Sequence, residues 1–121
     1  TDAAFAAKLA DGRVVTWGDA DQEVESIVST NYGGDSSSVQ AQLQGVETIY
    51  STGTAFAGAF AAKLADGRVV TWGDADYGGD SSSVQAQLQG VETIYSTYRA
   101  FAAKLADGRV VTWGQAKCGG D

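Results

Sequence analysis

The chain has 121 residues, of which 44% are hydrophobic and 19% are charged. This composition excludes a highly charged disordered tail, and the absence of any apolar run near the roughly 20 residues of a helical span excludes a transmembrane segment of its own. Eight basic residues stand against 15 acidic ones, a net charge of −7, so we expect no nucleic-acid partner. Histidine is absent, which removes the commonest general base and a favoured metal ligand, and we expect a soluble, non-enzymatic protein without a cofactor.

The two ends of the chain give little information on targeting. There is no Met, and the sequence opens in the middle of a repeated pattern at Thr1, so we expect a piece of something longer. No signal peptide is visible in this stretch, which leaves the compartment open. The single cysteine, Cys118, is either an incidental free thiol or the partner of an intermolecular bridge.

Internal repetition dominates the sequence. The segment 5–21 recurs unchanged at 60–76, and its greater part, 5–18, recurs again at 101–114. The segment 32–52 recurs unchanged at 77–97. We therefore predict one repeat domain, whose units are listed here: 1–21 (partial), 22–31 (a repeat fragment), 32–76 and 77–118.

The spacing of the copies is uneven. The step along the chain from Phe5 to Phe60 is longer than the step from Phe60 to Phe101. The surplus lies in residues 22–31, which align with 89–98, and in residues 53–58. Two origins stay open: loss of the middle of an additional unit, or imperfect assembly of the sequence from near-identical copies.

Each copy of the first motif predicts a β-hairpin. In residues 60–72, two extended segments flank Asp66-Gly67, the strongest short-range signal for a two-residue hairpin loop. This loop would set five pairs opposite each other: Ala65 and Arg68, Leu64 and Val69, Lys63 and Val70, Ala62 and Thr71, Ala61 and Trp72. In that register Trp72 lies over Ala61 within reach of the Lys63 side chain for a cation–π contact, and both faces are largely apolar. Such a sheet must be covered on both sides, which predicts stacked repeats. The residues expected to hold them are Phe5, Phe60, Phe101, Trp17, Trp72, Trp113, Gly12, Gly67 and Gly108.

The second motif is ambiguous. Ser82 and Gln85 have the spacing of a helix capping box, and Val84, Leu88 and Val91 recur at helical intervals. The same segment also alternates between apolar and polar residues, as a strand does, so helix and strand both stay open at 36–44 and 81–89. Residues 91–97 are β-branched and aromatic, and predict a strand.

The order of these motifs resembles the repeat of the regulator of chromosome condensation family, which includes HERC-like proteins. The matching residues are Leu88, Gly90 and Val91, then 100–105, Asp107-Gly108 and 110–114. The copies are also similar to tandem arrays of dinoflagellate proteins. The resemblance implies a β-propeller of four-stranded blades. We expect an all-β fold of tandem hairpins, with short helices a possibility, in one of three arrangements: an arc of a propeller, a short open β-solenoid, or part of a larger array.

Three groups of residues raise the question of chemistry. Asp74, Asp76 and Asp80 alternate in a glycine-rich loop, and could either ligate Ca²⁺ or serve as turn residues. The resemblance suggests that the three tryptophans could form a light-absorbing cluster like that of the plant ultraviolet-B photoreceptor. Each tryptophan has the same place in its hairpin, which favours a packing role instead. The serines 36–38 and 81–83 lack a histidine to activate them.

The leading hypothesis is a non-enzymatic structural or protein-interaction module, with protein partners inside a larger complex. The resemblance alone suggests a peripheral subunit, in an alga one of a photosynthetic membrane assembly. Two alternatives are a propeller that assists guanine-nucleotide exchange or ubiquitin ligation, as the resemblance implies, and a calcium-binding repeat protein.

Overall fold

The fold is all-β, as the sequence predicted. A computed structural model describes residues 4–18, 22–23, 29–30, 36–53 and 58–120. Eight strands of five residues or more lie in the described part of the chain, with a short two-residue ladder besides. The strands are β1 (Ala4–Lys8), β2 (Val14–Gly18), β3 (Gln22–Glu23), β4 (Ser29–Thr30), β5 (Val46–Gly53), β6 (Gly58–Leu64), β7 (Val69–Gly73), β8 (Val91–Ser96), β9 (Ala100–Leu105) and β10 (Val110–Gly114).

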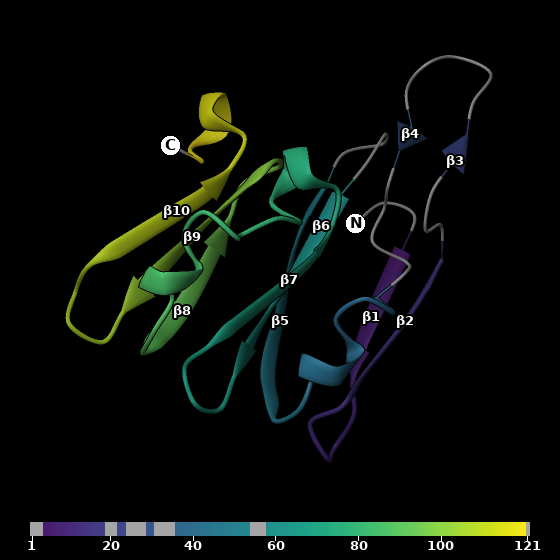
Figure 1. The fold of residues 1–121 in the computed structure, drawn as a ribbon, viewed down its shortest axis with the longest axis horizontal. Coiled ribbons are helices and arrows are strands. Elements are labelled where there is room, and N and C mark those ends of the chain that lie inside the picture. The colour runs from purple at the N-terminus through teal and green to yellow at the C-terminus, as the bar shows by residue number, and fades with distance from the viewer. Residues whose placement is uncertain (1–3, 19–21, 24–28, 31–35, 54–57, 121) are drawn as a thin grey trace.

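Three antiparallel sheets follow one another along the chain (Figure 1). The first sheet is the β1–β2 hairpin, the second has the order β5-β6-β7, and the third has the order β10-β9-β8. Each sheet is therefore built from neighbouring segments of the sequence, and no sheet closes into a barrel within the described residues. In that same part of the chain, no helix has the length and apolar character needed to cross a membrane.

The hairpins form where the sequence predicted, but the predicted register is wrong by one residue. Lys63 pairs with Val69 and Ala61 with Thr71, whereas a two-residue loop would pair Lys63 with Val70. The loop has three residues, because the N–H of Leu64 donates to the carbonyl of Arg68 at 2.8 Å. Gly67, with φ at +84°, takes the left-handed position that ends such a loop in a bulge.

The one-residue shift changes the partner of each tryptophan. Phe60, not Ala61, stands opposite Trp72, and their rings stack with centroids 5.3 Å apart. Phe101 and Trp113 repeat the arrangement at the same 5.3 Å. Lys63 makes an ion pair with Glu47, at 3.1 Å, in the place of the predicted contact with Trp72.

Both faces of the second sheet are covered, as the two-sided apolar pattern predicted. One face carries the Phe60–Trp72 pair and packs with Val14 of the first sheet. The other face carries small residues, Ala59 and Ala61, and packs against the third sheet. Each joint between sheets thus places an aromatic face on a face of small side chains, which allows the dense interdigitation of a protein core.

The segment before each long strand is neither an α-helix nor a strand. Single 3₁₀ turns, η1 (Gln40–Gln42) and η3 (Gln85–Gln87), occupy the ambiguous motif, and two further turns, η2 (Ala75–Tyr77) and η4 (Ala116–Cys118), follow the hairpins. The capping box predicted at Ser82 is not formed, because η3 has no side-chain cap. The amide of Gln85 is bonded to the carbonyl of Val69 instead. The strand predicted at 91–97 is confirmed as β8.

Candidate interaction surfaces

The joint between the second and third sheets centres on an aromatic pair. Trp113 is buried, and its indole N–H donates a hydrogen bond of 3.1 Å to the carbonyl of Gly78 in the loop after η2. Phe101 lies against the same glycine, where a Cβ would stand 2.6 Å from its ring. Burial of two such side chains is among the largest apolar contributions that a small sheet can obtain. The pair therefore fixes one sheet on the next.

A second connection links the hairpin turn of one sheet to the first strand of the next. The N–H of Val91 donates to the carbonyl of Gly67 at 3.0 Å. The joint between the first and second sheets contains the equivalent bond, from the N–H of Val46 to the carbonyl of Gly12 at 3.0 Å. A Cβ on Gly67 would lie 2.9 Å from the Cα of Gly90, so the two backbones touch.

Three polar side chains attach each serine-rich loop to the edge of the preceding sheet, an arrangement we call the Thr-Ser-Gln clamp. The hydroxyls of Thr71 and Ser81 are 2.9 Å apart, and the amide of Gln85 donates to Ser81 at 2.7 Å and to the carbonyl of Val69 at 3.0 Å. Ser81 is buried and its hydroxyl is engaged on two sides. This serine therefore has a structural role in the loop, which the sequence analysis did not predict.

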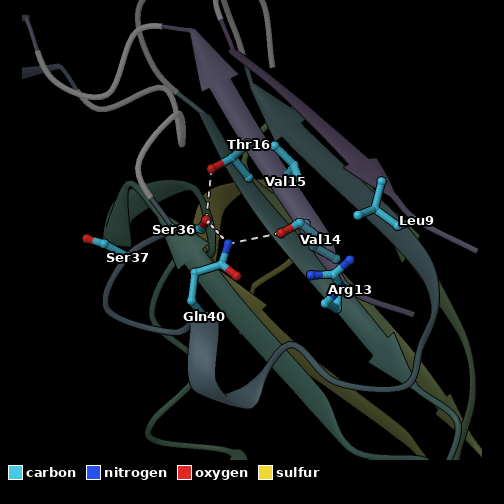
Figure 2. Close-up of a pocket in the computed structure, with 8 residues that line it drawn as sticks. All are labelled: Leu9, Arg13, Val14, Val15, Thr16, Ser36, Ser37 and Gln40. Carbon is cyan, nitrogen blue, oxygen red and sulfur yellow. Dashed lines mark hydrogen bonds between the residues drawn. The ribbon is translucent and has the colours of Figure 1, made fainter. Parts of the chain in front are cut away.

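The same clamp forms at the first sheet from Thr16, Ser36 and Gln40, at 2.8 Å, 2.7 Å and 3.0 Å (Figure 2). Here the threonine and serine are 20 residues apart, whereas their counterparts in the second sheet are 10 apart. The β3–β4 ladder lies in the additional stretch, beyond the end of β2 (Figure 1). The clamp thus has the same geometry with and without this additional stretch.

A hollow of about 420 Å³ lies beside this first clamp. Its lining consists of Leu9, Arg13, Val14, Val15, Thr16, Ser36, Ser37 and Gln40 (Figure 2). This lining contains no carboxylate, thiol or imidazole, the groups that serve most often as bases and metal ligands. Its serine Ser36 is held by the clamp, and the polar side chains of Arg13, Ser37 and Gln40 line the hollow beside the apolar ones.

The outer face of the third sheet is exposed where the same face of the second sheet is buried. We call it the open face and define it by Tyr95, Ala102, Val110 and Gly119. Val110 is 63% exposed, whereas its counterpart Val69 is 3% exposed. A Cβ on Gly119 would meet nothing within 4 Å, although at the equivalent Gly78 it would meet the ring of Phe101.

The first sheet has an exposed face at the opposite end of the stack. We call it the leading face and define it by Ala7, Leu9 and Val15. Val15 is 48% exposed, whereas its counterparts Val70 and Val111 are 5% and 6% exposed. The stack therefore ends in two different apolar surfaces, one from the aromatic side of a hairpin and one from the small-residue side.

The candidate calcium ligands Asp74, Asp76 and Asp80 lie in turns. The carboxylate of Asp74 accepts from the N–H of Asp76 at 2.8 Å, and that of Asp80 accepts from the N–H of Ser82 at 2.9 Å. No group of three or more candidate metal ligands gathers anywhere in the described ranges. These contacts are those of turn residues, and they provide no support for calcium binding.

The aspartates of the hairpin turns are held by their own arginines. The carboxylate of Asp66 accepts from the N–H of Arg68 at 3.1 Å and from its Nε at 2.7 Å. The backbone hydrogen bond, followed by the side-chain one, holds the pKa of Asp66 below its ordinary value. Asp11 and Asp107 repeat the turn and the direction of the pKa shift. The motif stabilises the loop and faces water.

The remaining sequence-predicted residues occupy equivalent places. Phe5 and Trp17 are opposite each other in the β1–β2 register, as their counterparts are in the other hairpins, and their side chains lie outside what the structure describes. Cys118 is a free thiol at the end of η4, and its Sγ lies 3.3 Å from Gln115 Oε1. Neither a protein-family model nor a curated protein matches this chain.

Proposed function

We propose that this chain is a non-enzymatic structural and protein-interaction module that works within a larger assembly. The observation that carries the proposal is the pair of apolar end surfaces, the leading face and the open face. Exposed apolar surfaces rimmed by polar residues are typical of sites at which proteins meet.

The internal polar contacts support the same conclusion. The buried threonine, serine and indole groups of the joints are engaged in holding one segment to the next, as with Thr52, whose hydroxyl donates to the carbonyl of Tyr77 at 2.6 Å. The side chains that repeat are packing and clamping groups. A stack of this kind can be extended at either end without rearrangement of its interior.

The resemblance to the regulator of chromosome condensation repeat provides a model for the whole. Antiparallel sheets that stack face to face, each directed the same way along the chain, suit an arc of a β-propeller. In this proposal the chain contributes three adjoining sheets, and its partners cover the two ends.

The experiment places a photo-crosslinking amino acid at position 110, in the open face, and compares it with position 87 on η3. Both positions are exposed. In an extract of the cells that make the protein, we expect defined adducts from position 110 and none from position 87. Fusion of a further copy of residues 77–118 to the C-terminus should abolish them, because the added sheet covers the open face. Adducts that are equal at the two positions, or that survive the fusion, would refute the proposal.

A further inference from the structure

The open face of the third sheet is equivalent to a face of the second sheet that is covered by another sheet in the same molecule. A hollow of about 210 Å³ lies in it, lined by Tyr95, Ser96, Thr97, Ala100, Phe101, Ala102, Cys118 and Gly119. On the second sheet, the equivalent surface around Ala59, Ala61 and Gly78 is filled by the Phe101–Trp113 pair of the third sheet. The hollow therefore corresponds to the place that a stacked phenylalanine and tryptophan fill on the second sheet.

The chain contains one hairpin of the right sequence whose aromatic side covers no other sheet among the described residues. Residues 5–18 are identical to residues 101–114, the hairpin that occupies this seat on the second sheet. The backbone register is also the same, since Phe5 is opposite Trp17 as Phe101 is opposite Trp113. Val15, on that side of the hairpin, is 48% exposed.

We infer that a second copy of this chain seats its β1–β2 hairpin on the open face, so that copies join head to tail. The inference rests on the proposed function, and names the partner of that surface. The leading face of one copy meets the open face of the next, and the two surfaces differ, so the contact is heterologous. Contacts of this kind repeat along a chain of copies until a ring closes or a filament grows.

Sedimentation equilibrium of the purified protein alone tests the inference. We expect the weight-average mass to rise with concentration between about 10 µM and about 1 mM, the range of a weak to moderate association. A constant monomer mass over this range would overturn the inference. It would leave the proposed function standing if position 110 still forms adducts with another protein in the extract.

Two variants separate head-to-tail contact from other modes of association. Val110→Glu places a charge on the open face, and Val15→Lys places one on the leading face. Both side chains are exposed, so each variant should fold. Because a charge buried without a partner is strongly disfavoured, we expect either change to weaken association about tenfold or more. Gln87→Glu adds a charge on the exposed turn η3, and is the matched control that should associate as the parent does.

The mixture of the two variants gives the decisive result. The Val15→Lys chain keeps its open face and the Val110→Glu chain keeps its leading face, so the mixture should form a one-to-one dimer that grows no further. Association of Val15→Lys alone at the parent's strength would show contact between two open faces, and would overturn the inference. Ala102→Glu provides a second block of the open face, with circular dichroism to show that each variant is folded.

Discussion

Replacement of Gly67 by alanine should loosen the joint between the second and third sheets. Gly67 has φ at +84°, and a Cβ there would lie 2.9 Å from the Cα of Gly90 and 3.2 Å from the N of Val91. Both neighbours are backbone atoms, which cannot rotate away as the end of a side chain can. The turn and the strand would have to separate, and the hydrogen bond that joins them would lengthen.

The expected loss has two parts. Alanine in the left-handed region costs about 1–2 kcal/mol. Separation also weakens the bond from the N–H of Val91 to the carbonyl of Gly67, worth about 1 kcal/mol net. The free energy of unfolding should therefore fall by about 2–3 kcal/mol. Gly108→Ala is the matched control, because Gly108 has φ at +89° and open space beside it, so only the first part applies.

Urea unfolding of the two variants, followed by tryptophan fluorescence, measures the difference. The effect of alanine on the entropy of the unfolded chain is common to both and cancels. We expect Gly67→Ala to be less stable than Gly108→Ala by about 1 kcal/mol, which is the value of the hydrogen bond between turn and strand. Equal losses would show that the contact between turn and strand contributes nothing, and would refute the reasoning.

Three further predictions concern the joints, the clamp and the turns. Trp113→Phe should cost about 1–3 kcal/mol in chemical unfolding, because the buried carbonyl of Gly78 loses its donor; a loss no larger than the experimental error would contradict this role. Ser81→Ala should lower the unfolding free energy by a similar amount, about 1–3 kcal/mol. The exposed Ser83→Ala should stay within about 0.5 kcal/mol of the parent, and equal effects of the two would count against the clamp. Asp66 has a lowered pKa in the folded state, so it contributes stability above its ordinary value of 3.8 that is lost as the pH falls below it. In urea titrations at several pH values, Asp66→Asn should therefore make stability fall less steeply in acid, and an unchanged slope would contradict the assignment.

The positions of the hairpins could be predicted from the sequence, but their register could not. The Asp66-Gly67 pair marks the turn, yet it is compatible with a two-residue loop and with a three-residue loop that ends in a bulge. The β9–β10 hairpin also has the three-residue loop, although a Cβ on Gly108 would meet nothing within 4 Å, so contact with a following sheet does not decide the choice. In each of the three turns the aspartate accepts from the N–H of the arginine two residues later. The sequence prediction rested on the Asp-Gly pair alone and did not consider this contact.

The two-sided apolar pattern correctly predicted that the second sheet would be covered on both faces, whereas the first and third sheets each keep one exposed face. The apolar pattern did not predict the Thr-Ser-Gln clamp, because the three residues of the clamp are polar. The spacing from Thr16 to Ser36 also differs from the spacing between Thr71 and Ser81. A signal was present in the sequence. Serine and glutamine stand four residues apart before each long strand, which is also the spacing of the bonded side chains.

The clamp forms with two different lengths of chain between its threonine and its serine. This bears on how such a gene can change. Replication slippage between near-identical tracts of DNA adds or removes blocks of codons, and most proteins tolerate this badly. Here the threonine and serine of the clamp meet across 20 residues in the first sheet and across 10 in the second. Repeat copies of unequal length are therefore compatible with the same clamp.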